Sequence, residues 1–176
     1  MRTARALLLL ALFLLPAAGH AGEQALKSLL PAQSNTLAVI PDSYLYVQGN
    51  DLTQIYDGGY QRYLRAGVTE VVQQLYRGPG GLTLTVTIHG LATAAAATAF
   101  FQAQRKQVPK EVPVRPAAQG RGFTYLAAGV KYGVVAGPRL VAVLSGYGGQ
   151  PGDRAQLEQV LAGIAARSRP PKARTG

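Results

Sequence analysis

Leu82-Thr-Leu-Thr-Val-Thr-Ile88 alternates strictly between aliphatic residues and threonine, which is the two-residue period of a β-strand with one buried face. The turn signal Gly78-Pro-Gly-Gly81 precedes this run, and Val68 to Arg77 before the turn is rich in β-branched residues. The three segments together predict a β-hairpin. We expect the aliphatic side chains of its second strand to face a core, so that the sheet has one dry face.

Three further strands are predicted downstream, at Phe123 to Ala127, Val130 to Val135 and Leu140 to Leu144, and short turns join them into a meander. Three helices are predicted from apolar residues at helical spacing and from capping residues: one before the hairpin, one after it from Thr93 through Lys106, and a last one capped by Asp153 with Gln156. The order is helix, two strands, helix, three strands, helix. It predicts an α+β domain, a mostly antiparallel sheet of about five strands packed with three helices.

The remaining segments have weaker patterns. Gln24 to Leu30 is predicted to form one or two helical turns, and Leu37 to Ile40 and Ser43 to Val47 are predicted to be extended. Residues 108–121 contain three prolines and several basic residues. We expect them to form an exposed loop with a short extended piece at Val112 to Val114.

The N-terminus has the layout of a secretory signal peptide. Arg2 and Arg5 precede an apolar run from Ala6 to Leu15, and small residues follow up to Ala21. The run is shorter than the roughly 20 residues that a membrane span needs, which disfavours the alternative of an uncleaved anchor. We therefore expect cleavage near Ala21, a periplasmic or secreted protein with a single domain over residues 22–168, and a disordered basic tail over residues 169–176.

The charge of the chain is basic and unevenly distributed. Removal of Arg2 and Arg5 with the signal peptide lowers the formal net charge from +10 to +8, and most of the excess lies after Tyr76. Such a surface suits an anionic polymer or lipid, although the scatter of the basic residues favours a general compositional bias. No motif indicates specific recognition of nucleic acid. The candidates for electrostatic binding are Arg105, Lys106, Lys110, Arg115, Arg121, Arg167, Arg169, Lys172 and Arg174.

The first predicted helix contains an unusual glycine pair. Asn50 is its predicted N-cap and Gly67 its predicted left-handed end, while Gly58 and Gly59 in between each cost about 1 kcal/mol relative to alanine. One interpretation is that the glycines allow another backbone to pack closely, and this is the favoured one. The alternative is a recess for a small ligand, because tyrosines suit sugars, peptides and aromatic groups. Its candidate residues are Tyr56, Asp57, Gly59, Tyr60, Arg62 and Tyr63.

The sequence of the same predicted helix resembles that of a known family. The run Asp51-Leu-Thr-Gln-Ile-Tyr-Asp-Gly-Gly-Tyr-Gln-Arg-Tyr-Leu-Arg-Ala-Gly67, followed by two strands and a helix with Phe100-Phe101, resembles an uncharacterised bacterial exported family, domain of unknown function six-five-nine-nine. The chain departs from the family pattern at His89-Gly90-Leu91, where the family tends to have an acidic residue and a small-residue turn. The resemblance implies export and an α+β fold, and it implies no activity.

Few residues are suited to catalysis. The chain has no cysteine, and after signal cleavage His89 is its single histidine. We expect His89 at the polar side of a strand end, solvated, with no nucleophile motif near it in sequence. The glycine-rich turns lack the lysine and Ser/Thr of a phosphate-binding loop. No cofactor and no metal site are predicted.

These observations favour a non-enzymatic exported binding or interaction module for an envelope protein or a small ligand. Two alternatives stay open: a periplasmic hydrolase that uses Asp57 or His89, and an electrostatic binder of anionic polymer or lipid. The sequence leaves the oligomeric state and the ligand open.

Overall fold

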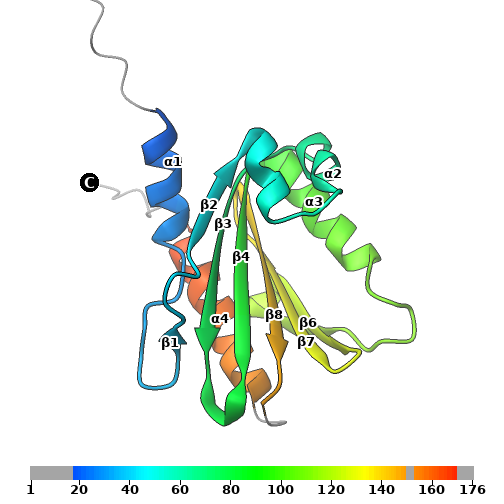
Figure 1. Ribbon diagram of the computed structural model, residues 1–176. Helices are drawn as coiled ribbons and strands as arrows, with labels where there is room; N and C mark the ends of the chain where they lie inside the picture. Colours follow the sequence, from blue (N-terminus) through cyan, green and yellow to red (C-terminus); the bar gives the residue numbers. More distant parts are fainter. Residues whose placement is uncertain (1–17, 150–152, 170–176) are drawn as a thin grey trace, which may run out of the picture.

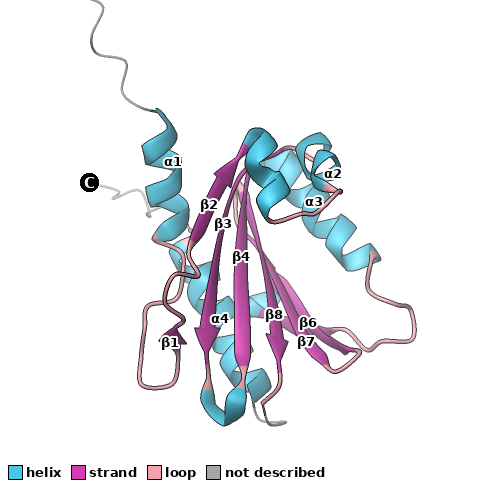
Figure 2. Cartoon of the chain, viewed as in Figure 1, coloured by secondary structure: helices cyan, strands magenta, loops and turns pink. Residues whose placement is uncertain are grey.

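A computed structural model describes residues 18–149 and 153–169. Its centre is an eight-stranded antiparallel sheet with the order β1-β3-β4-β8-β7-β6-β5, in which β2 also pairs with β3 (Figure 1). Figure 2 shows helices on both sides of this sheet. The strands are β1 Ala38–Val39, β2 Leu45–Gln48, β3 Val68–Arg77, β4 Thr83–Leu91, β5 Arg115–Ala117, β6 Gly122–Ala127, β7 Val130–Ala136 and β8 Leu140–Tyr147.

Four α-helices and three 3-10 helices complete the part of the chain that the structure describes. The α-helices are α1 Ala18–Lys27, α2 Tyr60–Arg65, α3 Ala94–Lys106 and α4 Asp153–Arg167, and the 3-10 helices are η1 Gly49–Gln54, η2 Pro79–Gly81 and η3 Ala118–Gly120. The α+β class is therefore as predicted. The expected count of five strands and three helices is wrong.

The predicted hairpin and meander are confirmed. Strands β3 and β4 pair with Val72 opposite Ile88, and β6, β7 and β8 follow one another as antiparallel neighbours. The strands missing from the predicted count are the short ones. β1 and β2 follow one another along the same edge of β3, and β5 pairs with the start of β6. The extended segments predicted at Leu37 to Ile40 and Ser43 to Val47 contain β1 and most of β2, but their pairing with β3 has no local signal.

The segment predicted as an exposed loop is partly ordered against the core. Arg115 to Ala117 form β5, and the predicted extended piece at Val112 to Val114 lies just before that strand. Val108, Ala117 and Ala118 are buried. The expectation of an exposed loop is wrong at these positions, because the apolar residues on either side of the prolines are buried and Val112 and Val114 pack against the core.

The predicted helix from Asn50 to Gly67 is broken in two. η1 begins after Gln48 without any side-chain cap, so the predicted cap at Asn50 is wrong. Gly58 has a φ of +65°, which ends the first segment before α2 starts. Gly67 takes the predicted left-handed conformation, and Thr93 caps α3 by accepting a hydrogen bond from the Ala96 amide at 3.0 Å.

Both faces of the sheet are covered, so the expected single dry face is also wrong. On one face, Leu84, Val86 and Ile88 pack with apolar residues of α1 and α4. On the other face, Val71 and Val141 belong to a second core with residues of η1 and α3. Figure 1 shows α4 behind the sheet and α2 and α3 in front of its upper end. The threonines of β4 lie on this second face, and they are partly buried rather than facing open water.

The expected signal peptide and the expected basic tail lie largely outside the described residues. Residues 1–17 of the expected signal peptide and residues 170–176 of the expected tail fall outside them, and α1 runs through the expected cleavage point after Ala21. The residues before Asp153 also fall outside, so its predicted capping role stays a prediction. No helix within residues 18–149 and 153–169 is long and apolar enough to cross a membrane.

Candidate functional site

The tyrosines of the predicted ligand site form a stacked aromatic cluster. The rings of Tyr56 and Tyr63 stack with centroids 3.7 Å apart, and both lie about 6 Å from the ring of His89. Phe100 of α3 closes the cluster, 5.0 Å from His89. Stacked and tilted aromatic pairs of this kind stabilise a core beyond the area that they bury.

His89 is buried inside this cluster, with 2% of its surface exposed, so its expected solvated position is wrong. It lies on the predicted side of β4, but η1, α2 and α3 cover that side. Its Nδ1 donates to the carbonyl oxygen of Val141 at 2.9 Å, which leaves Nε2 as the acceptor for the Tyr56 hydroxyl. Burial lowers the pKa of His89 to about 4, so the ring is neutral at pH 7.

The other predicted site residues lie at the surface side of the cluster. Asp57 and Arg62 are exposed and Tyr60 is half-buried. Arg62 lies over the ring of Tyr63 and donates to its hydroxyl at 3.1 Å. The cavities described below are lined by other residues, and the ligand-binding role of these six residues stays a prediction.

The glycine pair has a conformational role. A Cβ atom at Gly58 would meet nothing within 4 Å, and at Gly59 its nearest neighbour would be Arg62 Nε at 3.8 Å. Neither glycine is needed for a close backbone approach, so the favoured packing interpretation is wrong. Gly58 is needed for the positive φ that turns the chain between η1 and α2.

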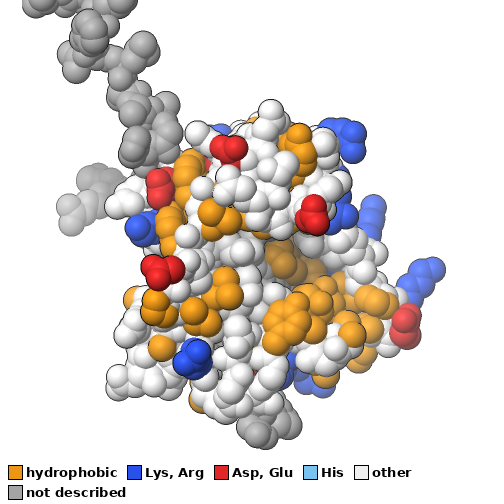
Figure 3. Space-filling view, viewed as in Figure 1, with side chains coloured by type: hydrophobic (Ala, Val, Ile, Leu, Met, Phe, Trp, Pro, Cys, Tyr) orange, Lys and Arg blue, Asp and Glu red, His pale blue; other side chains and the backbone are white. Residues whose placement is uncertain are grey.

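A cavity of about 610 Å³ lies between the start of α4 and the end of the sheet formed by β5, β6 and β7. The two layers touch closely at Gly133, where a Cβ would be 2.6 Å from Leu157 Cδ2. Beyond this contact the β6–β7 hairpin extends past α4, and the space between the hairpin and the helix is the cavity. Figure 3 shows the opposite side of the sheet, the side of α2 and α3, where apolar side chains gather on the surface.

Two tyrosines among the lining residues form a stacked pair on the face of the sheet away from α4, because they alternate with Thr124 and Gly133, which face α4. Tyr125 and Tyr132 face each other across β6 and β7, and their rings stack at 4.7 Å. Burial raises the pKa of Tyr125, so its phenol is neutral at pH 7. Leu157 is buried at the helix side, whereas Leu126 is 59% exposed. Leu126 pairs with Lys131 across the hairpin, so both side chains lie on the face of the sheet that α4 covers.

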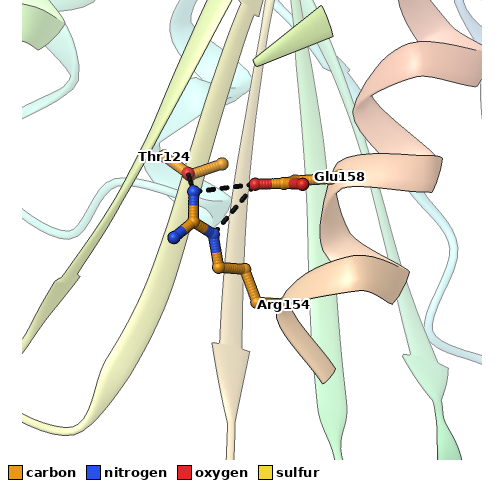
Figure 4. Close-up of polar contacts among 3 residues, drawn as sticks. All are labelled: Thr124, Arg154 and Glu158. Carbon is orange, nitrogen blue, oxygen red and sulfur yellow. Dashed lines mark hydrogen bonds and ion pairs between the residues drawn. The ribbon is translucent and has the colours of Figure 1, made fainter. Parts of the chain in front are cut away.

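The polar part of the lining is basic. Arg115, Lys131 and Arg154 line the cavity, and no aspartate or glutamate does among the described residues that line it. Arg154 donates from Nε to Glu158 Oε1 at 2.8 Å and from Nη2 to Thr124 Oγ1 at 3.2 Å (Figure 4). Lys131 donates to the carbonyl oxygen of Gly148 at 2.8 Å. These contacts fix two cations at the cavity wall.

A second cavity of about 480 Å³ lies between α1 and the upper edge of the sheet, where Glu70 and Arg139 are among its lining. The Tyr46 hydroxyl donates to Glu70 Oε2 at 2.9 Å, and Arg139 donates to the backbone of Leu91 and Ala92. These polar groups therefore already have hydrogen-bond partners within the protein. Within residues 18–149 and 153–169, no cluster of three or more His, Asp and Glu side chains could hold a metal ion.

Several basic residues proposed for electrostatic binding have partners inside the fold. Arg121 donates to the carbonyl of Ala165 at 3.2 Å, and Arg167 donates to that of Leu29 at 2.8 Å. Arg105 lies over the ring of Phe123. Among the described residues of this set, Arg115 alone lines the larger cavity. Lys172 and Arg174 lie outside the described residues.

Sequence reasoning missed the larger cavity and the tyrosine pair, although a signal for the pair was present. The two-residue turn Ala128-Gly129 sets the register of β6 and β7, and this register places Tyr125 opposite Tyr132. Two tyrosines paired across a hairpin are a recognisable aromatic surface. The position of Arg154 has no comparable signal in the sequence, because it depends on where α4 packs against the sheet.

The comparisons with known proteins show a fold and no family. No family model and no curated protein matches the chain. Among solved structures, it is similar to the extracellular domain of PknH from Mycobacterium tuberculosis, with a TM-score of 0.57 and 17% identity over 83% of this chain and 95% of that one. An uncharacterized protein from Mycobacterium smegmatis is aligned with a TM-score of 0.37 and 11% identity over 84% of this chain and 95% of that one. The first likeness shows the fold, and the suggested family membership stays a prediction.

Proposed function

We propose that this chain is an exported, non-enzymatic binding module whose ligand site is the cavity between α4 and the β6–β7 hairpin. The observation that carries the proposal is the cavity of about 610 Å³, whose lining combines the basic residues Arg115, Lys131 and Arg154 with the exposed side chain of Leu126. Ligand pockets of roughly 300–1,000 Å³ combine apolar side chains with a few placed polar groups. The N-terminal signal pattern and the fold shared with an extracellular domain support export.

The proposal gives no catalytic role to the residues of the hydrolase alternative. His89 is neutral and buried, and both of its ring nitrogens already have partners. Asp57 is exposed on the turn between η1 and α2. A general base needs a free nitrogen or oxygen positioned at a bound substrate. His89 has no free nitrogen, and Asp57 lines neither of the two cavities described above.

Binding of a neutral apolar fluorescent probe, N-phenyl-1-naphthylamine, tests the proposal. We expect saturable binding to the chain that begins at Gly22, and roughly tenfold weaker binding after Leu126→Ala, because the probe then loses an exposed apolar side chain of the lining. Tyr147→Ala is the matched control, since Tyr147 is 52% exposed and does not line the cavity. Absence of saturable binding, or an equal loss in both variants, would contradict the proposed site.

A further inference from the structure

We propose that signal cleavage after Ala21 completes the fold, because the α-ammonium group that it creates at Gly22 forms an ion pair with the carboxylate of Glu70 and fastens α1 to β3. The proposal rests on the expected cleavage point and is independent of the ligand cavity. Its basis is the position of Gly22 within α1, the contact between Gly22 and Glu70, and the charges around them.

The carboxylate of Glu70 is held against the backbone of Gly22. A Cβ atom at Gly22 would clash with Oε2 of Glu70 and would lie 3.0 Å from its Cδ atom. Because the nitrogen and the Cβ atom of one residue are about 2.5 Å apart, the Gly22 nitrogen lies within about 5.5 Å of this Cδ. On the other side, a Cβ atom at Gly90 would be 2.6 Å from Glu70 Cγ. Two glycines therefore make room for the Glu70 side chain, and the Tyr46 hydroxyl fixes its carboxylate from a third side.

Cleavage changes the charge at Gly22. In the uncleaved chain its nitrogen is a neutral amide inside α1, which runs through the cleavage point. After cleavage the same nitrogen is an ammonium group at the first residue of the shortened helix. A positive charge at a helix N-terminus is unfavourable by itself, because it opposes the helix dipole. The carboxylate of Glu70 is close enough to reverse this effect.

The acidic side chains at this end of α1 lack a cationic partner. Glu70 and Glu23 each accept from a tyrosine hydroxyl at 2.9 Å, and within residues 18–149 and 153–169 neither forms an ion pair. Arg139 lines the same cavity as Glu70 but donates to backbone carbonyl groups at and just after the end of β4. Lys27 lies over the ring of Tyr44. Two uncompensated negative charges therefore lie where cleavage supplies a positive charge.

The experiment compares the chain that begins at Gly22 with a form of it whose α-amino group alone is acetylated. We expect acetylation to lower the Tm of the parent chain by about 1 to 3 °C, because it removes the positive charge of the pair. In Glu70→Gln, whose side chain can still accept from Tyr46, this loss should shrink or change sign, since the ammonium then mainly opposes the helix dipole.

Glu111→Gln is the matched control, because Glu111 is exposed in the segment between α3 and β5. In this variant acetylation should lower the Tm as much as in the parent chain. An equal loss in the parent chain and in Glu70→Gln, or no loss in the parent chain, would overturn the ion pair.

Salt provides a second measurement, which keeps the test valid if Glu70→Gln does not fold. The difference in Tm between the free and the acetylated parent chain should fall by about half or more between about 0.05 M and about 1 M NaCl, because salt screens the attraction. A difference that does not depend on salt would also overturn the proposal.

Discussion

The polar side chain of His89 is buried among aromatic rings, and its two hydrogen bonds make this burial possible. Val141 accepts from Nδ1 and Tyr56 donates to Nε2, so the neutral ring has no unsatisfied nitrogen. The rings of Tyr56, Tyr63 and Phe100 surround it, and no carboxylate is among these neighbours to stabilise an imidazolium. Charging the ring inside the fold is therefore costly.

This cost predicts a specific pH dependence of stability. The pKa of His89 is about 4 in the folded chain, below its ordinary value of 6.5, so the unfolded chain binds more protons between these values. The stabilisation is complete above about pH 6.5 and is lost as pH falls toward 4. We expect His89 to account for a loss of about 2 to 3 kcal/mol in unfolding free energy between pH 7 and pH 4.5.

Urea unfolding of the parent chain and of His89→Gln at both pH values measures this effect. Glutamine can still donate to Val141 and accept from Tyr56, but it does not titrate. The carboxylates titrate in both chains, so the difference between the two pH profiles isolates His89. Parallel profiles would show that the imidazole is not buried as described.

At the scale of elements, the turn between η1 and α2 depends on one glycine of the pair. Gly58 has a φ of +65°, whereas Gly59 has a φ of −127° and its Cβ position has no neighbour closer than 3.8 Å. We expect Gly58→Ala to destabilise the chain by about 1 to 2 kcal/mol, because alanine is strained in the left-handed region. Gly59→Ala should stay within about 0.5 kcal/mol of the parent.

Thermal or urea unfolding of the two single variants checks this pair. They share the same chemical change and adjacent positions, so a difference reports the backbone conformation alone. A greater loss for Gly59→Ala would restore the interpretation in which the glycines serve close packing. An equal loss would mean that the chain is helical through both positions.

The elements also show which features a sequence can predict. The central hairpin and the meander were predictable, because alternation and turn glycines are local signals, as in Leu82 to Ile88. The helix from Asn50 to Gly67 was predicted as one piece because the apolar spacing continues across Gly58. Helical periodicity carries no information on a single positive φ, so the break was invisible.

The segments of β1 and β2 were predicted to be extended, but the pairing of the short strands with the sheet could not be predicted. β1, β2 and β5 have two to four residues each, and they exist because β3 and β6 offer free edges. The same holds for the candidate site. The tyrosine pair follows from the β6–β7 register, but Arg154 reaches Thr124 only because α4 crosses the sheet there.

At the scale of the whole molecule, the two ends of the described chain meet on one face of the sheet. Leu26 and Leu29 belong to the same core as Leu161 of α4. Arg167 at the end of α4 donates to the carbonyl of Leu29. Beside them, the Tyr76 hydroxyl donates to the carbonyl of Pro31 at 3.0 Å. The segment after the expected cleavage point is therefore part of the fold.

This arrangement predicts that the N-terminal leucines stabilise the mature chain. Leu26 and Leu29 are 6% and 7% exposed, so we expect Leu26→Ala and Leu29→Ala each to lower the free energy of unfolding by about 2 to 5 kcal/mol. The same substitution at Leu126, which is 59% exposed, should cost much less. Urea unfolding of the chain that begins at Gly22 measures all three. Losses at Leu26 and Leu29 no larger than at Leu126 would mean that α1 does not pack on the sheet, and a chain that begins at Pro31 would then be as stable as one that begins at Gly22.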